Sequence, residues 1–472
     1  MQQLEINDIQ GLLIRGYGEL PACNFILLSI RNKVAARQWI KEILPEITPG
    51  SKKPQSIALH IAFTYAGLHA IGLSQETLDS FSIELEDGML TPHKQLFLGD
   101  FGNSSPANWQ WGGPNQTPPH LMLMVYAIDE TALNDWYLKH EPRFINNGLS
   151  LIKRLDTGVI SDRKEHFGFH DGIAQPIIEG LSKKAEPGNT VPPGEFILGY
   201  KNNYDQYPNT PQVPDDAFSN DLPMAESPGL RDLGKNGSYL VFRQMEQDVG
   251  GFWNYVRKVT SENGIDNTEE MIKLASKFVG RWPSGAPITA CPDKDDTGLG
   301  NMDNFGYRSF DADGQRCPIG SHIRRTNPRD SMDMDIKASV EISNKHRILR
   351  RGRSYGKPVC ESLDPAAILN SKNFEGERGL HFICFNSDIS RQFEFIQNAW
   401  VNNPKLSRLY NERDPIIGNN LHPQDEHRQG IFSIPMKGLR KRYCDVPEFV
   451  TIKGGAYFFM PGIKSLTYLS SI

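Results

Sequence analysis

Apolar runs of strand length alternate with amphipathic stretches along most of the chain, and this alternation predicts its secondary structure. In the first half we expect strands at residues 24–30, 56–64 and 120–128. Helices are expected directly after them, at residues 34–44, 65–81 and 131–140. Short buried strands that alternate with helices indicate a sheet covered by helices on one or both of its faces.

The second half repeats this order of elements. Its expected strands are residues 237–245, 379–387 and 454–463, and its expected helices are residues 250–259 and 388–401. Two halves that each alternate strands with helices suggest an internal duplication of an α+β unit. The similarity lies in the pattern alone, because we find no repeat of residues.

Two long stretches interrupt the pattern and have the composition of loops. Residues 181–235 are rich in Pro, Gly, Asn and Asp, and residues 291–315 are acidic and contain glycines. Loops of this length usually have a function or act as a tether. The aspartate spacing of the second loop does not match a calcium-binding EF-hand.

The composition restricts the class of protein. The chain has 472 residues, which favours two domains or one large composite, and its formal net charge of −5 argues against a nucleic-acid-binding protein. No apolar run approaches the length of about 18 residues that a membrane span needs. Six cysteines without a Cys-x-x-Cys pair, and an N-terminus carrying Glu5 and Asp8 instead of a secretory signal, indicate a soluble cytoplasmic protein with reduced thiols.

The stretch from Phe167 to Pro176, FGFHDGIAQP, is the first that could carry chemistry. His166, His170 and Asp171 are residue types that bind metals, but Gly168 and Gly172 favour a strand that runs into a turn. A metal pair, a catalytic pair and an Asp-Gly turn with a packed histidine all agree with these residues.

The second stretch is CPIGSHIRRTNPRD, residues 317–330, in which His322 is followed by a cluster of arginines. A neutral imidazole could bind a haem iron axially while guanidinium groups neutralise its propionates. A solvated basic face or a phosphate site explains the same residues.

Two further stretches lie in the second half. The segment HRILRRGRSYG, residues 346–356, holds four arginines, and one that points inward would be a fixed positive charge able to stabilise a developing anion. In GLHFICFNS, residues 379–387, apolar side chains occur at both parities, as in a strand buried on both faces. Such a strand is either ordinary core or an apolar wall for a flat cofactor.

Together these stretches resemble the dye-decolorizing peroxidases, a family of haem enzymes. The resemblance rests on the Gly168-x-x-Asp171-Gly172 motif, CPIGSHIRRTNPR, an ILRRGxxYG-type segment and FICFNSDISRQFEFIQNAW. The segments DIQGLLIRGYG and TYAGLHAIGL look like the N-terminal half of that family. The resemblance covers nearly the whole chain, and the long loops make the chain similar to the larger members.

The resemblance implies an α+β fold of two ferredoxin-like domains with antiparallel sheets. We expect an N-terminal domain at residues 1–180, a loop excursion at 181–235, and a C-terminal domain at 236–472 that holds most of a haem b. The implied reaction reduces hydrogen peroxide and oxidises bulky aromatic or dye-like donors, without nucleic acid or membrane as a partner. The physiological donor and the oligomeric state stay open.

Matching the motifs also assigns roles. His322 would be the proximal ligand of the haem iron, and Asp171 and Arg350 would lie on the distal face, where peroxide binds. An aspartate, with an ordinary pKa of about 3.9, stays a base in acid, where a histidine near about 6.5 would be charged. The other expected cofactor-binding residues are Arg324, Leu380 and Phe382.

Three further expectations concern residues around this core. An acidic partner of His322 would make the imidazole a stronger donor, and we expect Asp388 first and Glu394 second in this place. Tyr355 matches a family position credited with relaying electrons from the surface, although an ordinary half-buried tyrosine fits equally well. His170 has no role in the family pattern.

Two other functions agree with part of the sequence. A protein for haem or iron handling, with incidental peroxidase activity, would bind haem tightly and turn over little peroxide. A non-haem metal enzyme built on His166, His170 and Asp171 would contain zinc or manganese instead of iron.

Overall fold

The computed structural model describes residues 3–158, 163–181, 188–420 and 430–472. The main elements of the first half are β1 (Ala22–Ile30), α1 (Lys33–Ile43), β2 (Ile57–Phe63), β3 (Leu121–Ala127), α6 (Glu130–Asn146) and β4 (Leu149–Asp156). Between β2 and β3 lie four short helices, α2 (Tyr65–Ile71), α3 (Gln75–Leu78), α4 (Ile83–Asp87) and α5 (Pro92–Leu98). The expected single helix at 65–81 is therefore wrong, because Gly72 adopts a left-handed conformation with φ of 105° and ends α2.

The second half begins with β9 (Ser238–Gln247) and continues with helices and short strands. The helices are α7 (Val249–Thr260), α8 (Thr268–Val279), α9 (Arg308–Asp311), α10 (His322–Thr326), α11 (Ile336–Lys345), α12 (Pro365–Asn370) and α13 (Ile463–Ser471). The other strands are β10 (Leu349–Arg350), β11 (Arg353–Tyr355), β12 (Gly379–Asn386), β13 (Ile431–Met436), β14 (Leu439–Cys444) and β15 (Val450–Met460). The expected helix at 388–401 forms two π-helical segments, Ser390–Glu394 and Ile396–Val401.

The large strands form one sheet in the order β10-β12-β9-β15-β2-β3-β1-β4, with β11 also paired to β12. Neighbouring strands are antiparallel throughout this sheet. The first half contributes β1, β2, β3 and β4, and the second half contributes β9, β10, β12 and β15. When each set is numbered 1 to 4 along the chain, both halves have the strand order 4-1-3-2. The two halves are thus two ferredoxin-like units with the same topology, and the pairing of Phe459 with Phe63 links them.

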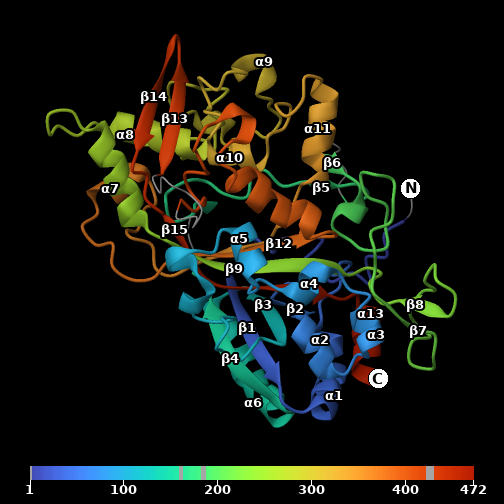
Figure 1. Cartoon of the computed structure of the whole chain (residues 1–472). Coiled ribbons are helices and arrows are strands. Elements are labelled where there is room, and N and C mark those ends of the chain that lie inside the picture. The colour runs from blue at the N-terminus through green and yellow to red at the C-terminus, as the bar shows by residue number, and fades with distance from the viewer. Residues whose placement is uncertain (1–2, 159–162, 182–187, 421–429) are drawn as a thin grey trace.

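The two halves of the sheet face each other and have their helices outside. Phe25 on β1 and Phe242 on β9 are four strands apart in the sheet order, yet their ring centroids are 5.2 Å apart. A flat sheet would separate them by about 19 Å, at about 4.8 Å per strand, so the sheet folds back on itself. Figure 1 shows α1, α2 and α6 on one side, and α7, α8, α10 and α11 on the other.

The part of the expected loop excursion that spans residues 188–235 packs into the core, which does not fit a tether. It contains short strands and buries Phe196, Ile197 and Tyr200 in the layer between the two halves. Residues 182–187 of this excursion lie outside the described residues. The short strands in and beside it are β5 (Ile177–Ile178), β6 (Thr190–Val191), β7 (Gln212–Pro214) and β8 (Leu230–Asp232). In the described part of the chain, no helix combines the length and apolar character that crossing a bilayer requires.

Candidate functional site

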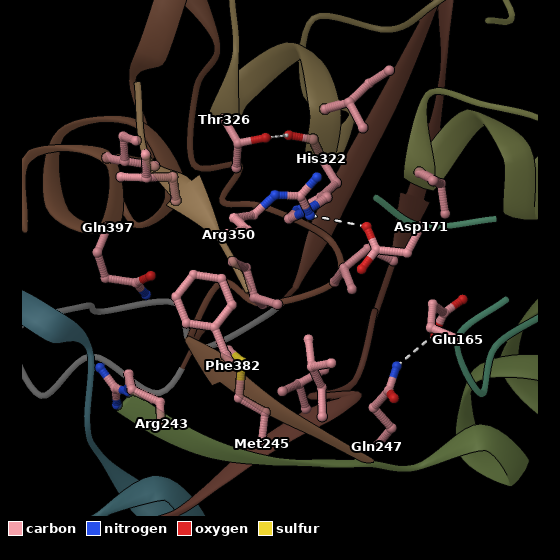
Figure 2. A pocket seen from close by; sticks show the side chains of 18 of the residues that line it. Glu165, Asp171, Arg243, Met245, Gln247, His322, Thr326, Arg350, Phe382 and Gln397 are labelled. Atoms are coloured by element: carbon pink, nitrogen blue, oxygen red, sulfur yellow. Dashed lines mark hydrogen bonds and ion pairs between the residues drawn. The ribbon is translucent and has the colours of Figure 1, made fainter. Parts of the chain in front are cut away.

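A cavity of about 260 Å³ lies on the outer face of the second half of the sheet. Its floor is formed by side chains of β9 and β12, and α10 and the segment around residues 165–174 form other walls. Figure 2 shows His322, Asp171 and Arg350 pointing toward one another across this space, with Phe382 and Met245 on the floor. The structure therefore brings together the three residues to which the sequence assigned the main chemistry.

His322 is the first residue of α10, and a buried carboxylate fixes the orientation of its ring. Its Nδ1 lies 2.9 Å from Oδ2 of Asp414, while Oδ1 of Asp414 accepts the backbone N–H groups of Ile416 and Ile417. Burial alone would lower the pKa of His322, but Asp414 outweighs burial and raises it. Within the described residues Nε2 has no hydrogen-bond partner, so it is free to bind a ligand in the cavity.

Asp414 replaces both residues that the sequence suggested as the partner of His322, and that prediction is wrong. Asp388 accepts the backbone N–H of Arg391 and pairs with its guanidinium at 3.6 Å. Glu394 forms a buried ion pair with Lys94 at 2.8 Å and accepts a hydrogen bond from Tyr457. Neither lines the cavity. Asp414 follows His322 by 92 residues, and no spacing rule connects the two positions.

Asp171 and Arg350 form an ion pair inside the cavity. Nη1 of Arg350 lies 2.9 Å from Oδ1 of Asp171, and the same oxygen accepts the N–H of Gly172. Burial alone would raise the pKa of Asp171, but Arg350 and the Gly172 N–H lower it below its ordinary value. The Asp171 side chain keeps 42% of its surface accessible, so the carboxylate is charged and within reach of a small molecule.

The loop around Asp171 has the turn geometry that its glycines predicted. Gly168 and Gly172 have φ values of 97° and 81°, in the region that favours glycine. A Cβ on Gly168 would also lie 2.9 Å from the carbonyl oxygen of Leu363. His170 lines the cavity with Nδ1 3.2 Å from the Ser284 carbonyl oxygen.

Arg347 contributes a positive charge to the cavity, and no side chain among the described residues bonds to its guanidinium. Its side chain is buried and lines the cavity, and no hydrogen bond or ion pair holds its guanidinium among the described residues. Burial lowers its pKa to about 10, so the group is still charged near neutral pH. A buried guanidinium without a partner fits an anionic group of a bound ligand.

The two arginines Arg329 and Arg324 lie in different environments, and only Arg329 faces the cavity. Arg329 lines the cavity, where Asp303 of the acidic loop binds its guanidinium. Arg324 does not line the cavity, and its prediction as a cofactor-binding residue is wrong. Its guanidinium donates to Asp311 and to the carbonyl oxygen of Cys317, on the other side of α10.

The two faces of β12 separate the cavity from the core. Leu380 and Phe382 line the cavity, as the sequence predicted, together with Met245 of β9. His381 points to the opposite face and stacks on Tyr355 with ring centroids 4.5 Å apart. Tyr355 is 7% exposed and does not itself reach the surface, so its role as an electron relay stays a prediction.

His166 is directed away from the cavity, with Nε2 2.8 Å from the Tyr355 carbonyl oxygen. In the parts of the chain that the structure covers, no three His, Cys, Asp or Glu side chains are grouped to hold a metal ion. A bare metal site on His166, His170 and Asp171 therefore has no geometric support. The donor set fits a flat group that carries a metal for Nε2 of His322 and acidic arms for Arg347 and Arg329.

Glu165, Gln247 and Arg243 also line the cavity, and the sequence did not single them out. Arg243, Met245 and Gln247 lie at alternate positions of β9. Their side chains therefore share the face of the strand that meets the cavity. Period-two spacing on β9 is the signal that could have identified them. Glu165 carries no such signal.

Comparison with known proteins gives one consistent family. The model described as "Dyp-type peroxidase, C-terminal" matches residues 223–412. The chain is 32% identical to "Multifunctional dye peroxidase DyP2" of an Amycolatopsis species over 484 residues, which cover 99% of this chain and 93% of that protein. It is 30% identical to the "Dye-decolorizing peroxidase" of Exidia glandulosa, with coverage of 99% and 87%. The crystal structure of a fungal DyP-type peroxidase from Auricularia auricula-judae superposes with a TM-score of 0.77, at 25% identity and with both chains fully covered.

Proposed function

Because the chain belongs to the dye-decolorizing peroxidase family and is a haem-dependent peroxidase that uses hydrogen peroxide, we propose that His322, Asp171 and Arg350 carry out its chemistry. One observation supports this assignment above the others. A histidine with a carboxylate behind it and a free nitrogen in front shares a cavity with an ion-paired aspartate and arginine. We further infer that the donors are bulky aromatic or dye-like molecules.

The proposed cofactor is haem b, held mainly by the C-terminal domain. We divide the chain into an N-terminal domain at 1–180, the excursion at 181–235 and this domain at 236–472. Nε2 of His322 would bind the iron, Arg347 and Arg329 would bind the propionates, and Leu380 and Phe382 would cover the distal face. When bound, haem would supply a redox-active iron that takes up the two oxidising equivalents of hydrogen peroxide and passes them to the donors.

Asp414 supports this role of His322. Its carboxylate accepts the Nδ1 proton, which sets the tautomer and leaves the lone pair of Nε2 for the iron. The negative charge behind the ring makes the imidazole a stronger donor. Such a donor stabilises iron in its higher oxidation states.

Asp171 acts as the acid and base. Its lowered pKa keeps it deprotonated in mild acid, so it can accept a proton from one peroxide oxygen. It then returns this proton to the other oxygen, which leaves as water. Arg350 donates to the negative charge that develops as the oxygen–oxygen bond breaks. The 2.9 Å ion pair holds the carboxylate and the guanidinium in place in the cavity until peroxide enters between them.

The test is Asp171→Asn in the haem-loaded enzyme. Loss of the base should slow the reaction with hydrogen peroxide by about 10²- to 10⁴-fold, measured by stopped-flow absorbance of the haem. The control is Asp388→Asn, which removes a carboxylate outside the cavity and should leave the rate unchanged. A wild-type rate in Asp171→Asn would remove Asp171 from this role, and tight haem binding with negligible turnover in the wild type would favour haem or iron handling.

A further inference from the structure

Glu165 lines the cavity, and the proposed chemistry does not use it. Its carboxylate accepts three N–H groups. Oε2 accepts from the backbone of Phe167 at 2.9 Å and from Nε2 of Gln247 at 2.6 Å, and Oε1 accepts from the backbone of Phe169 at 3.1 Å. Two of these donors belong to the loop that carries Asp171.

The backbone of Glu165 closes the same loop. Its N–H donates to the Phe169 carbonyl at 2.9 Å, and its own carbonyl accepts the N–H of Gly168 at 2.9 Å. Residues 165–169 therefore form a turn. Both the backbone and the side chain of Glu165 hold this turn closed. Asp171 follows this turn by two residues, so any movement of the turn displaces its carboxylate.

Gln247 anchors this arrangement to the sheet. It is the last residue of β9, and its backbone N–H donates to the Arg378 carbonyl at 2.8 Å. Figure 2 shows its side chain reaching from the cavity floor to Glu165. The Glu165–Gln247 contact thus connects the Asp171 loop with the strand that carries Arg243 and Met245.

We propose that Glu165 is a positioning residue that holds the Asp171 loop over the cavity by accepting the Phe167, Phe169 and Gln247 donors. The effect of Glu165 on the reaction rests on the proposed role of Asp171. The contacts by which Glu165 holds the loop do not depend on that role. Small displacements matter here, since a shift of about 1 Å in a reacting group can cost about a hundredfold in rate.

The protonation of Glu165 gives the proposal a second observable. Burial raises the pKa of this carboxyl to about 7, against its three N–H donors, and the negative charge of Asp171 acts in the same direction as burial. The side chain of Gln247, from β9, is neutral, and no cation pairs with Glu165 among the described residues. A protonated carboxyl has weaker acceptors, so the loop should be held more firmly above pH 7 than below it.

The experiment uses Glu165→Gln in the haem-loaded enzyme. A glutamine keeps one acceptor oxygen and presents an NH₂ group to the remaining donor. We expect amide hydrogen exchange in residues 167–171 to become about tenfold faster, as the loss of one hydrogen bond implies. The reaction with peroxide should slow by about ten- to a hundredfold. The change near pH 7 that we expect of the wild type should be absent from this variant.

A double variant separates the loop from the side-chain contact. Glu165→Gln with Gln247→Glu restores an acid–amide pair, but the NH₂ group that meets the new carboxylate at position 247 takes the place of Oε2 and leaves the N–H of Phe167 without its acceptor. If the loop amides matter, the double variant should stay as impaired as the single one. Full rescue by the double variant would overturn the proposal, because the pair alone would then suffice.

A control variant completes the design. Glu195→Gln removes another buried carboxylate that accepts a backbone N–H, from Asn203, but lies outside the cavity. It should leave exchange in residues 167–171 and the pH profile unchanged. Unchanged exchange in Glu165→Gln would overturn the positioning role, whereas a wild-type peroxide rate in Asp171→Asn would overturn only the proposed role of Asp171.

Discussion

The His322–Asp414 pair shows how one hydrogen bond can set the properties of a ligand. Asp414 is buried, and two backbone N–H groups and His322 occupy its oxygens. Burial would raise its pKa, yet His322 and these donors lower it, so the carboxylate stays charged. The imidazole is thereby held in one tautomer.

We expect Asp414→Asn to weaken haem binding by about 10- to 100-fold, because the ring loses its orienting charge. The midpoint potential of the iron should rise, since less negative charge reaches the imidazole. Haem titration of the apoprotein and spectroelectrochemistry measure the two effects. The Asp388→Asn variant should match the wild type in both, and an unchanged haem affinity in Asp414→Asn would show that the pair is not needed for binding.

For single residues, the sequence predicted which side chains reach the cavity better than it predicted which groups those side chains bind. Asp171, Arg350, His322, Leu380 and Phe382 all reach the cavity, because each lies in a short motif that a resemblance can match. The expected acidic partner of His322 and the expected cofactor contact of Arg324 were wrong. Which carboxylate meets a given cation depends on the packing of segments that are far apart in sequence, as with Asp414 and Asp311.

At the scale of elements, the contact between β12 and β9 sets the shape of the cavity floor. Gly379 opens β12 opposite Glu246, and a Cβ at this position would lie 1.9 Å from the Met245 carbonyl oxygen. The strands can approach this closely only because Gly379 has no side chain. The same approach fixes the height of Leu380 beside Met245.

Gly379→Ala should therefore push β12 away from β9 and lower the free energy of unfolding by about 1–3 kcal/mol. Urea denaturation measures this loss, and haem titration should show weaker binding, because Leu380 moves with the strand. Gly18→Ala is the matched control, since a Cβ there meets nothing within 4 Å. Equal stability of the two variants would show that the strands can separate at no cost.

Elements with a strong apolar pattern were the ones that the sequence predicted well. β1, β2, β3, β9 and β12 agree with their expected ranges to within two residues, because each contains an apolar run of strand length. β4 was missed, since its sequence LSLIKRLD mixes polar and apolar residues on an edge of the sheet. The π-helical form of 390–401 depends on backbone hydrogen bonds that a hydrophobic pattern does not reveal.

At the scale of the molecule, the two halves are joined by an apolar layer. Phe25 is fully buried in this layer, with ring centroids 5.2 Å from Phe242 and 5.6 Å from His381. Both of these contacts cross from the first half to the second. An interface of this kind should make the halves unfold together.

Phe25→Ala should lower the free energy of unfolding by about 3–5 kcal/mol. Hydrogen exchange should show loss of protection in both β1 and β9, although only β1 is changed. Phe310→Ala, at a side chain that is 70% exposed, should cost less than about 0.5 kcal/mol. Loss of protection confined to the first half would contradict the coupling.

The sequence suggested the duplication but not how the copies meet. Repeated strand–helix order predicted two similar units, and the shared 4-1-3-2 strand order agrees with it. The face-to-face arrangement could not be predicted, because both faces of the strands are apolar and period-two patterns cannot tell a helix-covered face from one that meets another sheet.

Helix α13 has a consequence for the way the protein is made. Its Leu466, Tyr468 and Leu469 share one hydrophobic cluster with Trp39 and Ile40 of α1, and α13 packs directly on α1. Arg37 and Ile472, which bond to each other, are 435 residues apart. During translation, the first half therefore leaves the ribosome with part of α1, the part that α13 later covers, still exposed. This part stays exposed until almost the entire remaining chain has been made. In this interval α1 is an exposed surface that a chaperone can hold, and the nascent chain is most open to aggregation.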